Sequence, residues 1–329
     1  MPRAELDPAL SVRVVAVREL RYDDRAPLGE DRPEHVRAAS GLAMFGGRLV
    51  VVQDDAAFIA HVSESEVTAV ALPRGAAGRR RFEVALGNKM DKLDLEACVA
   101  AGDELWAFGS GSSPERERIA IVGYTTRLHD ARPLYRQLRE ELEGALNIEG
   151  AAIVGGKPAE PSGSFVPGSS ATRLRTSGGR PDEQLWLFHR GNTGPDDLGP
   201  AVVMLSRRAF ASWLASEAPV PPILGRVRYD LGSARGVRLG FTDAVAVGSR
   251  VFYLAAAEDS ANAIDDGGVL GCQLGVIEGD RVRAAPLALG KAEGLAFDPA
   301  DPRRAWIAID PDDVDLPAQL YEVELVGPW

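Results

Sequence analysis

The chain has 329 residues, of which 45% are hydrophobic, enough to build a large core. Its formal net charge of −11 argues against a nucleic acid partner, because phosphate backbones bind basic surfaces. No apolar run reaches the roughly 18 residues of a membrane span and no apolar signal core follows the N-terminus, so we expect a cytoplasmic protein without a membrane partner.

One short segment recurs five times along the chain, as expected for the blades of a propeller. Each copy begins with an acidic or hydroxyl residue, followed by a small residue and an apolar strand, and a second apolar strand comes later. We call the residues that begin the copies the lead residues: Ser40, Glu96, Glu149, Asp243 and Glu293. The second strands are predicted at 49–53, 105–108, 185–188, 251–254 and 305–309.

The period-2 apolar runs predict an all-β fold, a single five-bladed β-propeller domain with four antiparallel strands in each blade. The last repeat has only three strands before the chain ends, and the run at 11–20 is a strand without a repeat of its own. We therefore expect this N-terminal strand to complete the last blade and close the ring, which removes open sheet edges. The predicted blades cover about 40–85, 90–146, 147–235, 240–289, and 291–326 with 11–20.

Two features depart from the strand pattern, an insertion and a pair of helices. A stretch rich in Gly, Pro and Ser at 157–183 is interpreted as an insertion between the first two strands of blade three. Helices are predicted at 134–146 and, more briefly, at 209–215, both as outer decoration. Cys98 and Cys272 lie in apolar strands of different repeats and are interpreted as packed thiols rather than as a disulfide or metal site.

Propeller geometry predicts that the five lead residues converge at one end of the central axis. The turns after the second strands belong to the same face, and they carry polar residues: Asp54, Asp55, Ser110, Ser112, His189, Arg190, Asn192, Glu258, Asp259, Asp310, Asp312 and Asp313. Like-charged carboxylates about 4 Å apart repel by about 4 kcal/mol at an effective dielectric constant of about 20. The ring therefore needs protonation, basic partners or a bound cation.

An all-oxygen site suits a hard ion, and its flexible geometry favours Ca²⁺ over Mg²⁺. The hypothesis is an axial Ca²⁺ bound by the five lead residues Ser40, Glu96, Glu149, Asp243 and Glu293. The alternative is a water-filled ring in which Lys and Arg side chains and backbone N–H groups balance the acids. Only four of the 37 basic residues are lysines, and Lys89, Lys92 and Lys291 each lie within seven residues before a lead glutamate.

The order Ser, Glu, Glu, Asp, Glu, one residue in each blade, resembles the calcium-activated apyrase-type nucleotidases. Ser40, Glu96, Glu149 and Glu293 match by residue type, whereas Asp243 departs from the family pattern. The Glu149-Gly150-Ala151 and Glu293-Gly294-Leu295 segments also resemble bacterial phytase-like esterase and gluconolactonase-like propellers. These resemblances imply a five-bladed propeller with an axial Ca²⁺ and a hydrolytic activity, and most of all an uncharacterised bacterial propeller of the phytase-like type.

Two functions follow as hypotheses. The first is a Ca²⁺-dependent hydrolase of a small phosphorylated, ester or lactone substrate, in which Asp94 or Glu96 acts as general base and Arg190 contacts the substrate. Its substrate-binding residues would be Lys89, Lys92, Asn147, His189, Arg190 and Lys291. The second is a non-catalytic propeller that binds a ligand or a protein on its axial face, because no nucleophile motif is present.

Overall fold

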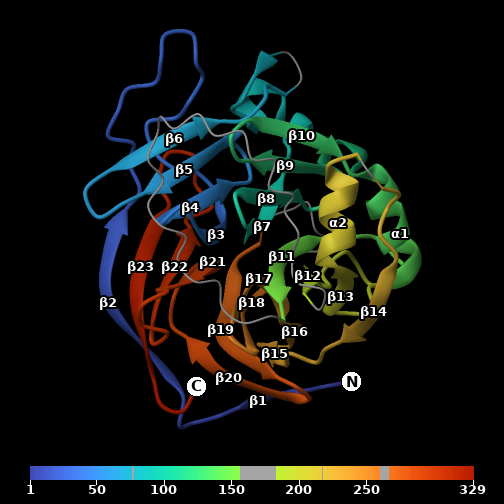
Figure 1. The fold of residues 1–329 in the computed structure, drawn as a ribbon. Coiled ribbons are helices and arrows are strands. Elements are labelled where there is room, and N and C mark those ends of the chain that lie inside the picture. The colour runs from blue at the N-terminus through green and yellow to red at the C-terminus, as the bar shows by residue number, and fades with distance from the viewer. Residues whose placement is uncertain (76–77, 156–182, 217, 260–266) are drawn as a thin grey trace.

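The computed structural model describes residues 1–75, 78–155, 183–216, 218–259 and 267–329. Five antiparallel sheets surround a central axis, so the predicted all-β, five-bladed β-propeller is confirmed. Figure 1 shows the first strand of each blade near the centre of the ring and the last strand at its rim. The expected insertion at 157–183 lies outside the described residues, except for Glu183.

Blades one to three follow each other along the chain, with strands in sequence order from the axis outwards. Blade one contains β3 (Ala39–Phe45), β4 (Arg48–Gln53), β5 (Phe58–Val62) and β6 (Val67–Ala71). Blade two contains β7 (Leu95–Ala101), β8 (Glu104–Gly109), β9 (Arg118–Val122) and β10 (Thr126–Asp130). Blade three contains β11 (Ile148–Val154), β12 (Gln184–His189), β13 (Ala201–Ser206) and β14 (Ile223–Arg228).

Blades four and five each take a strand from the N-terminal segment. Blade four contains β17 (Gly240–Val247), β18 (Arg250–Glu258), β19 (Val269–Glu278) and β20 (Arg281–Leu287), and β1 (Ala4–Leu6) adds to β20 in parallel. Blade five contains β21 (Lys291–Phe297), β22 (Arg304–Asp310) and β23 (Gln319–Val326), and β2 (Ser11–Glu19) is its outer strand. The predicted closure by the N-terminal strand is therefore confirmed. The fifth strand of blade four was not predicted, because three residues carry no periodic signal.

Shorter elements connect and cover the blades. The hairpin of β15 (Ser233–Ala234) and β16 (Val237–Arg238) precedes blade four, and the 3-10 helices are η2 (Val84–Leu86), η3 (Lys89–Asp91) and η4 (Pro114–Arg116). The helices are α1 (Arg132–Leu142) and α2 (Arg207–Leu214), each offset by a few residues from the sequence prediction. Helix α1 ends early because Glu143 adopts a left-handed backbone conformation, with φ of 59°. Neither described helix is long and apolar enough to cross a bilayer.

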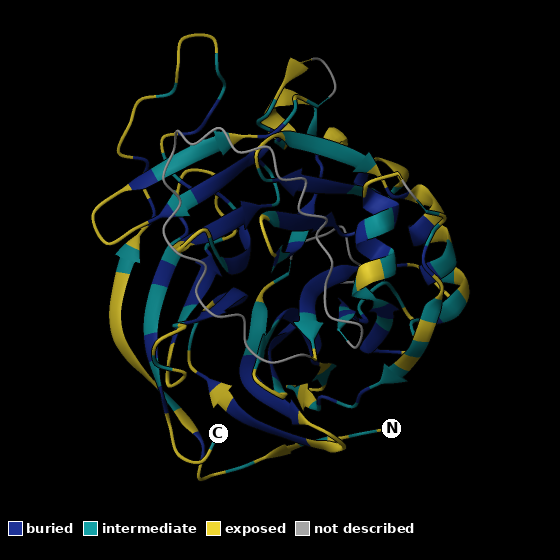
Figure 2. Ribbon diagram, in the orientation of Figure 1, coloured by how far each residue is buried: buried dark blue, intermediate teal, exposed yellow. Residues whose placement is uncertain are grey.

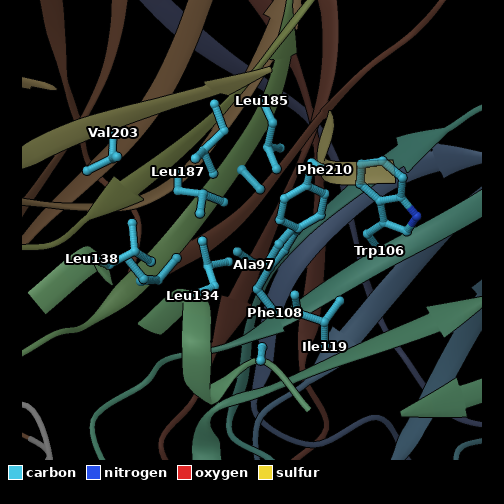
Figure 3. Packing of buried hydrophobic residues seen from close by; sticks show 14 of the residues in the cluster. Ala97, Trp106, Phe108, Ile119, Leu134, Leu138, Leu185, Leu187, Val203 and Phe210 are labelled. Atoms are coloured by element: carbon cyan, nitrogen blue, oxygen red, sulfur yellow. The ribbon is translucent and has the colours of Figure 1, made fainter. Parts of the chain in front are cut away.

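The core lies between adjacent blades. Figure 2 shows the inner strands as buried and the outer strand β2 as mostly exposed. Helices α1 and α2 fill the space between blades two and three, where Phe210 of α2 packs 5.2 Å from the ring of Trp106 (Figure 3). Cys98 and Cys272 are buried and unpaired, in agreement with their interpretation as packed thiols.

Candidate functional site

The first strands carry a β-bulge at the point where each enters the axis. One residue has no cross-strand partner in each first-to-second strand pair, and we call these the bulge residues: Ser40, Glu96, Glu149, Thr242 and Glu293. A bulge turns its extra side chain out of the regular alternation. Because the bulges occupy equivalent positions, the propeller directs these five side chains towards the same end of the axis.

The sequence alignment of blade four was wrong by one residue. Thr242, not Asp243, occupies the position equivalent to the other four lead residues. In the other four blades the residue after the bulge is small: Gly41, Ala97, Gly150 and Gly294. At the three glycines the neighbouring first strands approach one another closely. Asp243 fills that crowded position and is fully buried. Its carboxylate accepts hydrogen bonds from the backbone N–H groups of Ala244 and Leu295 at 2.7 Å and of Leu42 at 3.5 Å.

The two hydroxyl-bearing bulge residues are turned to the backbone. Ser40 Oγ donates to the carbonyl of Ala38 at 2.9 Å, and Thr242 Oγ1 donates to the carbonyl of Ala292 at 2.6 Å. The axial charge therefore comes from Glu96, Glu149 and Glu293 together with acids of the adjacent turns. We call the connected network of ionisable groups the axial cluster: Asp54, Asp94, Glu96, Glu149, Glu258, Glu293, Asp310, Asp312, Lys92, Arg116, Arg190 and Lys291.

On the side of blades one and two, Lys92 lies between two acids. Its Nζ is 2.5 Å from Asp54 Oδ1 and 2.7 Å from Asp94 Oδ1. Asp94 also pairs with Arg116 at 3.1 Å and accepts a hydrogen bond from Ser110. Although burial acts to raise it, the pKa of Asp94 is lowered to about 2 by Lys92 and Arg116. Burial raises the pKa of Asp54 to about 8, against the opposing effect of Lys92.

Asp94 holds this position at a conformational cost. Its φ of 55° is in the left-handed region, which non-glycine residues rarely adopt. Such strain costs on the order of 1–3 kcal/mol and persists only where the surrounding contacts enforce it. The ion pairs of Asp94 with Lys92 and Arg116 contribute to that enforcement.

Glu96 differs from its neighbours. Within the described part of the chain it makes no ion pair and no hydrogen bond through its carboxylate, and it is half-buried. Carboxylate oxygens of Asp54, Asp94 and Glu96 lie within 4.8 Å of one another. Burial, with the charges of Asp54 and Asp94, raises the pKa of Glu96 well above its ordinary value. Glu96 is therefore the acid that most needs either a proton or a cation.

On the side of blades three to five, Arg190 and Lys291 hold the remaining acids. Arg190 Nη1 lies 2.9 Å from Glu149 Oε1, and Nη2 lies 2.7 Å from Glu258. Lys291 Nζ lies 3.2 Å from Glu293 and 2.9 Å from Asp312. Burial raises the pKa of Glu293 well above its ordinary value, that of Glu149 less strongly, and that of Asp310 to about 7.

The other predicted substrate-binding residues have structural partners or lie apart. Asn147 donates to Glu149 at 2.5 Å, and its backbone N–H donates to His189 Nδ1 at 3.2 Å. His189 Nε2 lies 3.3 Å from Asp197, so both ring nitrogens are engaged. Lys89 lies in η3, and the ion pairs described above are made by Lys92 instead. Sequence reasoning missed Thr242 and also Arg116, which lies in the short 3-10 helix η4, a segment without a repeat signal.

The cluster is rich in negative charge, because its eight carboxylates face four basic side chains. A divalent cation fits the donor chemistry, since all available ligands are carboxylate oxygens, which Ca²⁺ and Mg²⁺ prefer. Burial is the main cause of the raised pKa values of Asp54, Glu96 and Glu293, and the charges of neighbouring acids add to it. Lys92 forms direct ion pairs with Asp54 and Asp94, whereas Glu96 forms none among the described residues.

The similarities to solved structures are distant. No curated protein is similar enough to count as a relative. Among solved structures, the chain resembles glutaminyl cyclase of Myxococcus xanthus, with 10% identity over 100% of this chain and 99% of that one and a TM-score of 0.45. It also resembles the PQQ-bound aldose sugar dehydrogenase of Streptomyces coelicolor, with 12% identity over 99% and 100% of the two chains and a TM-score of 0.44.

Virginiamycin B lyase of Staphylococcus aureus is similar at 10% identity over 96% of this chain and 100% of that one, with a TM-score of 0.40. These three proteins are enzymes, but similarities this distant carry no information on the activity of this chain. A family model described as "Family of unknown function (DUF6929)" matches residues 35–158 and 180–325. The chain therefore belongs to this family of unknown function.

Proposed function

We propose that the axial cluster binds a divalent cation, with Ca²⁺ as the best match, and that the protein hydrolyses a small phosphorylated, ester or lactone substrate at this ion. The observation that carries the proposal is the position of Glu96: its carboxylate makes no ion pair or hydrogen bond among the described residues, although Lys92 is near enough to interact with its charge, and a carboxylate oxygen of Glu96 lies within 4.8 Å of those of Asp54 and Asp94. Asp54 and Glu96 would hold the ion, with Glu149 and Glu293 contributing charge from across the axis.

The residues divide the remaining tasks. A bound Ca²⁺ would polarise the scissile oxygen of the substrate. Of the two predicted general bases, Asp94 has a pKa of about 2, too low for proton transfer near neutral pH, and Glu96 as a ligand of the ion would lose the raised pKa that it has in the metal-free protein, so neither is assigned as the base. Arg190 and Lys291 belong to the same axial cluster, but they form ion pairs with Glu149 and Glu293. Their first role is therefore to neutralise these acids rather than to contact a substrate.

One observation favours the second hypothesis, a propeller that binds a ligand without converting it. Lys92, Arg190 and Lys291, which a phosphate-binding site would use, all pair with carboxylates within the cluster. A site whose cations are already neutralised attracts a positive or neutral ligand more readily than a phosphate. Both the hydrolase and the non-catalytic propeller would bind the cation, and only the hydrolase would convert its ligand.

The test is calorimetric titration of the metal-free protein with Ca²⁺ and Mg²⁺, followed by hydrolysis assays on nucleotides, phosphate esters, esters and lactones. We expect Ca²⁺ to bind more tightly than Mg²⁺, and Glu96→Gln to weaken Ca²⁺ binding by at least about tenfold, because it removes a negative charge at contact distance. The matched control is Glu140→Gln, an exposed glutamate of α1, which should leave binding unchanged.

The outcomes are distinct. Ca²⁺ binding with turnover of any substrate class, lost in Glu96→Gln, supports the hydrolase. Ca²⁺ binding without turnover in the whole panel supports the ligand-binding alternative. Failure of both ions to bind at millimolar concentration, or equal binding by Glu96→Gln and Glu140→Gln, would overturn the cation site.

A further inference from the structure

A cavity of about 580 Å³ opens between blades five and one. Its walls come from β2, the β3–β4 hairpin, β22 and β23. Strand β3 begins at the axial cluster and ends at Phe45, and β22 begins at Arg304 and ends at Asp310 in the cluster. The cavity therefore lies at the opposite end of these strands and is separate from the proposed cation site.

The cavity exists because nothing in the described chain fills this wedge. Adjacent blades diverge towards the rim, and between blades two and three the gap is filled by side chains of α1 and α2, such as Leu138, Phe210 and Trp213. Blades five and one have no such helix, and Met44 and Trp306 remain only partly buried. With Leu49 and Leu320 these side chains make an apolar floor. The volume is within the range of roughly 300–1,000 Å³ typical of small-molecule sites.

Three tryptophans occupy equivalent positions in the second strands, and only one of them faces this cavity. Trp106, Trp186 and Trp306 each lie opposite the third residue after the bulge. The indole N–H donates at 2.9 Å to Glu104 in blade two and to Gln184 in blade three, each two residues earlier on the same strand. In blade five the corresponding residue is Arg304, which cannot accept a hydrogen bond.

The indole N–H of Trp306 consequently has no acceptor among the described residues, and it is open to solvent rather than sealed in the core. Three of the six polar side chains that line the cavity are arginines, which only donate. Arg18, Arg48 and Arg304 line the cavity with Glu64 and Glu322, and Arg304 is paired with Glu322 at 2.5 Å. Arg48 is exposed and makes no ion pair within the described chain. The cavity thus combines an apolar floor with unpaired donors in a chain of net charge −11.

We propose that this cavity binds a small organic carboxylate with an aromatic or acyl body. The apolar body packs on Trp306, Met44 and Leu320, and the carboxylate accepts hydrogen bonds from Arg48 and from the indole N–H of Trp306. A carboxylate is the acceptor that a guanidinium group and an indole N–H can share, since both groups only donate. The large flat indole provides the stacking surface for the body of the ligand.

The test uses the five tryptophan indole N–H signals of the ¹⁵N-labelled protein as reporters. The Trp306→Phe variant assigns the signal of Trp306, and 2-naphthoate, indole-3-acetate and laurate are titrated in turn. We expect a saturable shift of the Trp306 signal with at least one of these carboxylates. The neutral 2-naphthalenemethanol should bind about tenfold more weakly than 2-naphthoate, because it cannot form the charge-assisted hydrogen bond.

Two arginine variants separate this site from general charge effects. Arg48→Gln should raise the Kd of the carboxylate about tenfold, whereas Arg208→Gln, an exposed arginine of α2 on blade three, should leave it unchanged. The proposal is overturned if none of the three carboxylates moves the Trp306 signal at millimolar concentration. It is also overturned if the alcohol binds as tightly as the acid, or if both arginine variants behave alike.

Discussion

Asp243 is the residue on which the centre of the propeller depends most directly. Its carboxylate joins β3, β17 and β21 by accepting backbone N–H groups from all three strands. Burial raises the pKa of Asp243 well above its ordinary value, while these hydrogen bonds act to lower it. No hydroxyl or small side chain at this position could satisfy three donors from three blades.

We expect Asp243→Ala to lower the free energy of unfolding by about 2–4 kcal/mol. Each buried N–H group that loses its acceptor costs about 1–3 kcal/mol, and water can relieve only part of this cost. Asp243→Asn keeps one acceptor oxygen and should cost less. Urea unfolding at pH 7 measures both, with the exposed Asp196→Ala as the control. If Asp243→Ala unfolds at the same urea concentration as Asp196→Ala, the three hydrogen bonds do not stabilise the axis.

At the scale of the element, β2 decides whether the ring is closed. It pairs with β23 from Ser11–Val326 to Glu19–Gln319, so the last blade along the chain is completed by a strand from the N-terminal end. The pair has a bulge at Val15, and Val14, Val15 and Val17 are more than 40% exposed on this outer strand. A bulge on an edge strand disfavours pairing with another sheet, which limits aggregation at this edge.

Removal of residues 1–19 should leave the straight edge of β23 open, and we expect a protein that aggregates and melts at lower temperature than the full chain. Addition of a peptide with residues 11–19 should restore part of the melting temperature, because it can re-form the β2–β23 pairing. Removal of residues 1–8, which deletes only β1, is the control and should have a much smaller effect. Thermal unfolding and size-exclusion chromatography measure all three. A soluble 20–329 fragment with unchanged melting temperature would contradict the closure argument.

For the whole molecule, the axial cluster links stability to pH. Asp54 and Asp310, with pKa values raised to about 8 and about 7, keep their protons in the folded state where the unfolded chain, with an ordinary carboxyl pKa of about 4, has lost them. The unfolded state therefore binds fewer protons, and the stability contributed by these groups falls as the pH rises from about 4 to 8. Asp94, with a pKa of about 2, acts in the opposite sense below pH 4.

We therefore expect metal-free protein to be most stable near pH 4 and to lose stability towards pH 8, by up to about 1.4 kcal/mol per pH unit for each protonated group. Ca²⁺ needs ionised carboxylates, so it should stabilise the protein more at pH 8 than at pH 5. Asp54→Asn should flatten the profile, whereas the exposed Asp196→Asn should not. Urea unfolding at several pH values, with and without Ca²⁺, provides the measurement. A profile that rises from pH 5 to 8 without metal would contradict this assignment.

The repeat, the number of blades and the closure by the N-terminal strand could all be predicted from the sequence, because strand periodicity and the missing fourth strand of the last repeat are local patterns. The gathering of Glu96, Glu149 and Glu293 at one axial end followed from the same periodicity. The register of the bulge in blade four could not be predicted, because Thr242 and Asp243 both fit the pattern of a polar residue before an apolar strand.

The sequence by itself thus determined the architecture and which acids approach the axis. Only the tertiary structure decided which of them are paired, because the partners Arg116, Arg190 and Lys291 reach the acids from a 3-10 helix and from strand ends whose positions depend on packing between blades. It also decided where a wedge between blades stays open beside Trp306. Cross-strand register and the filling of space between sheets are set by long-range contacts, which a local sequence pattern does not predict.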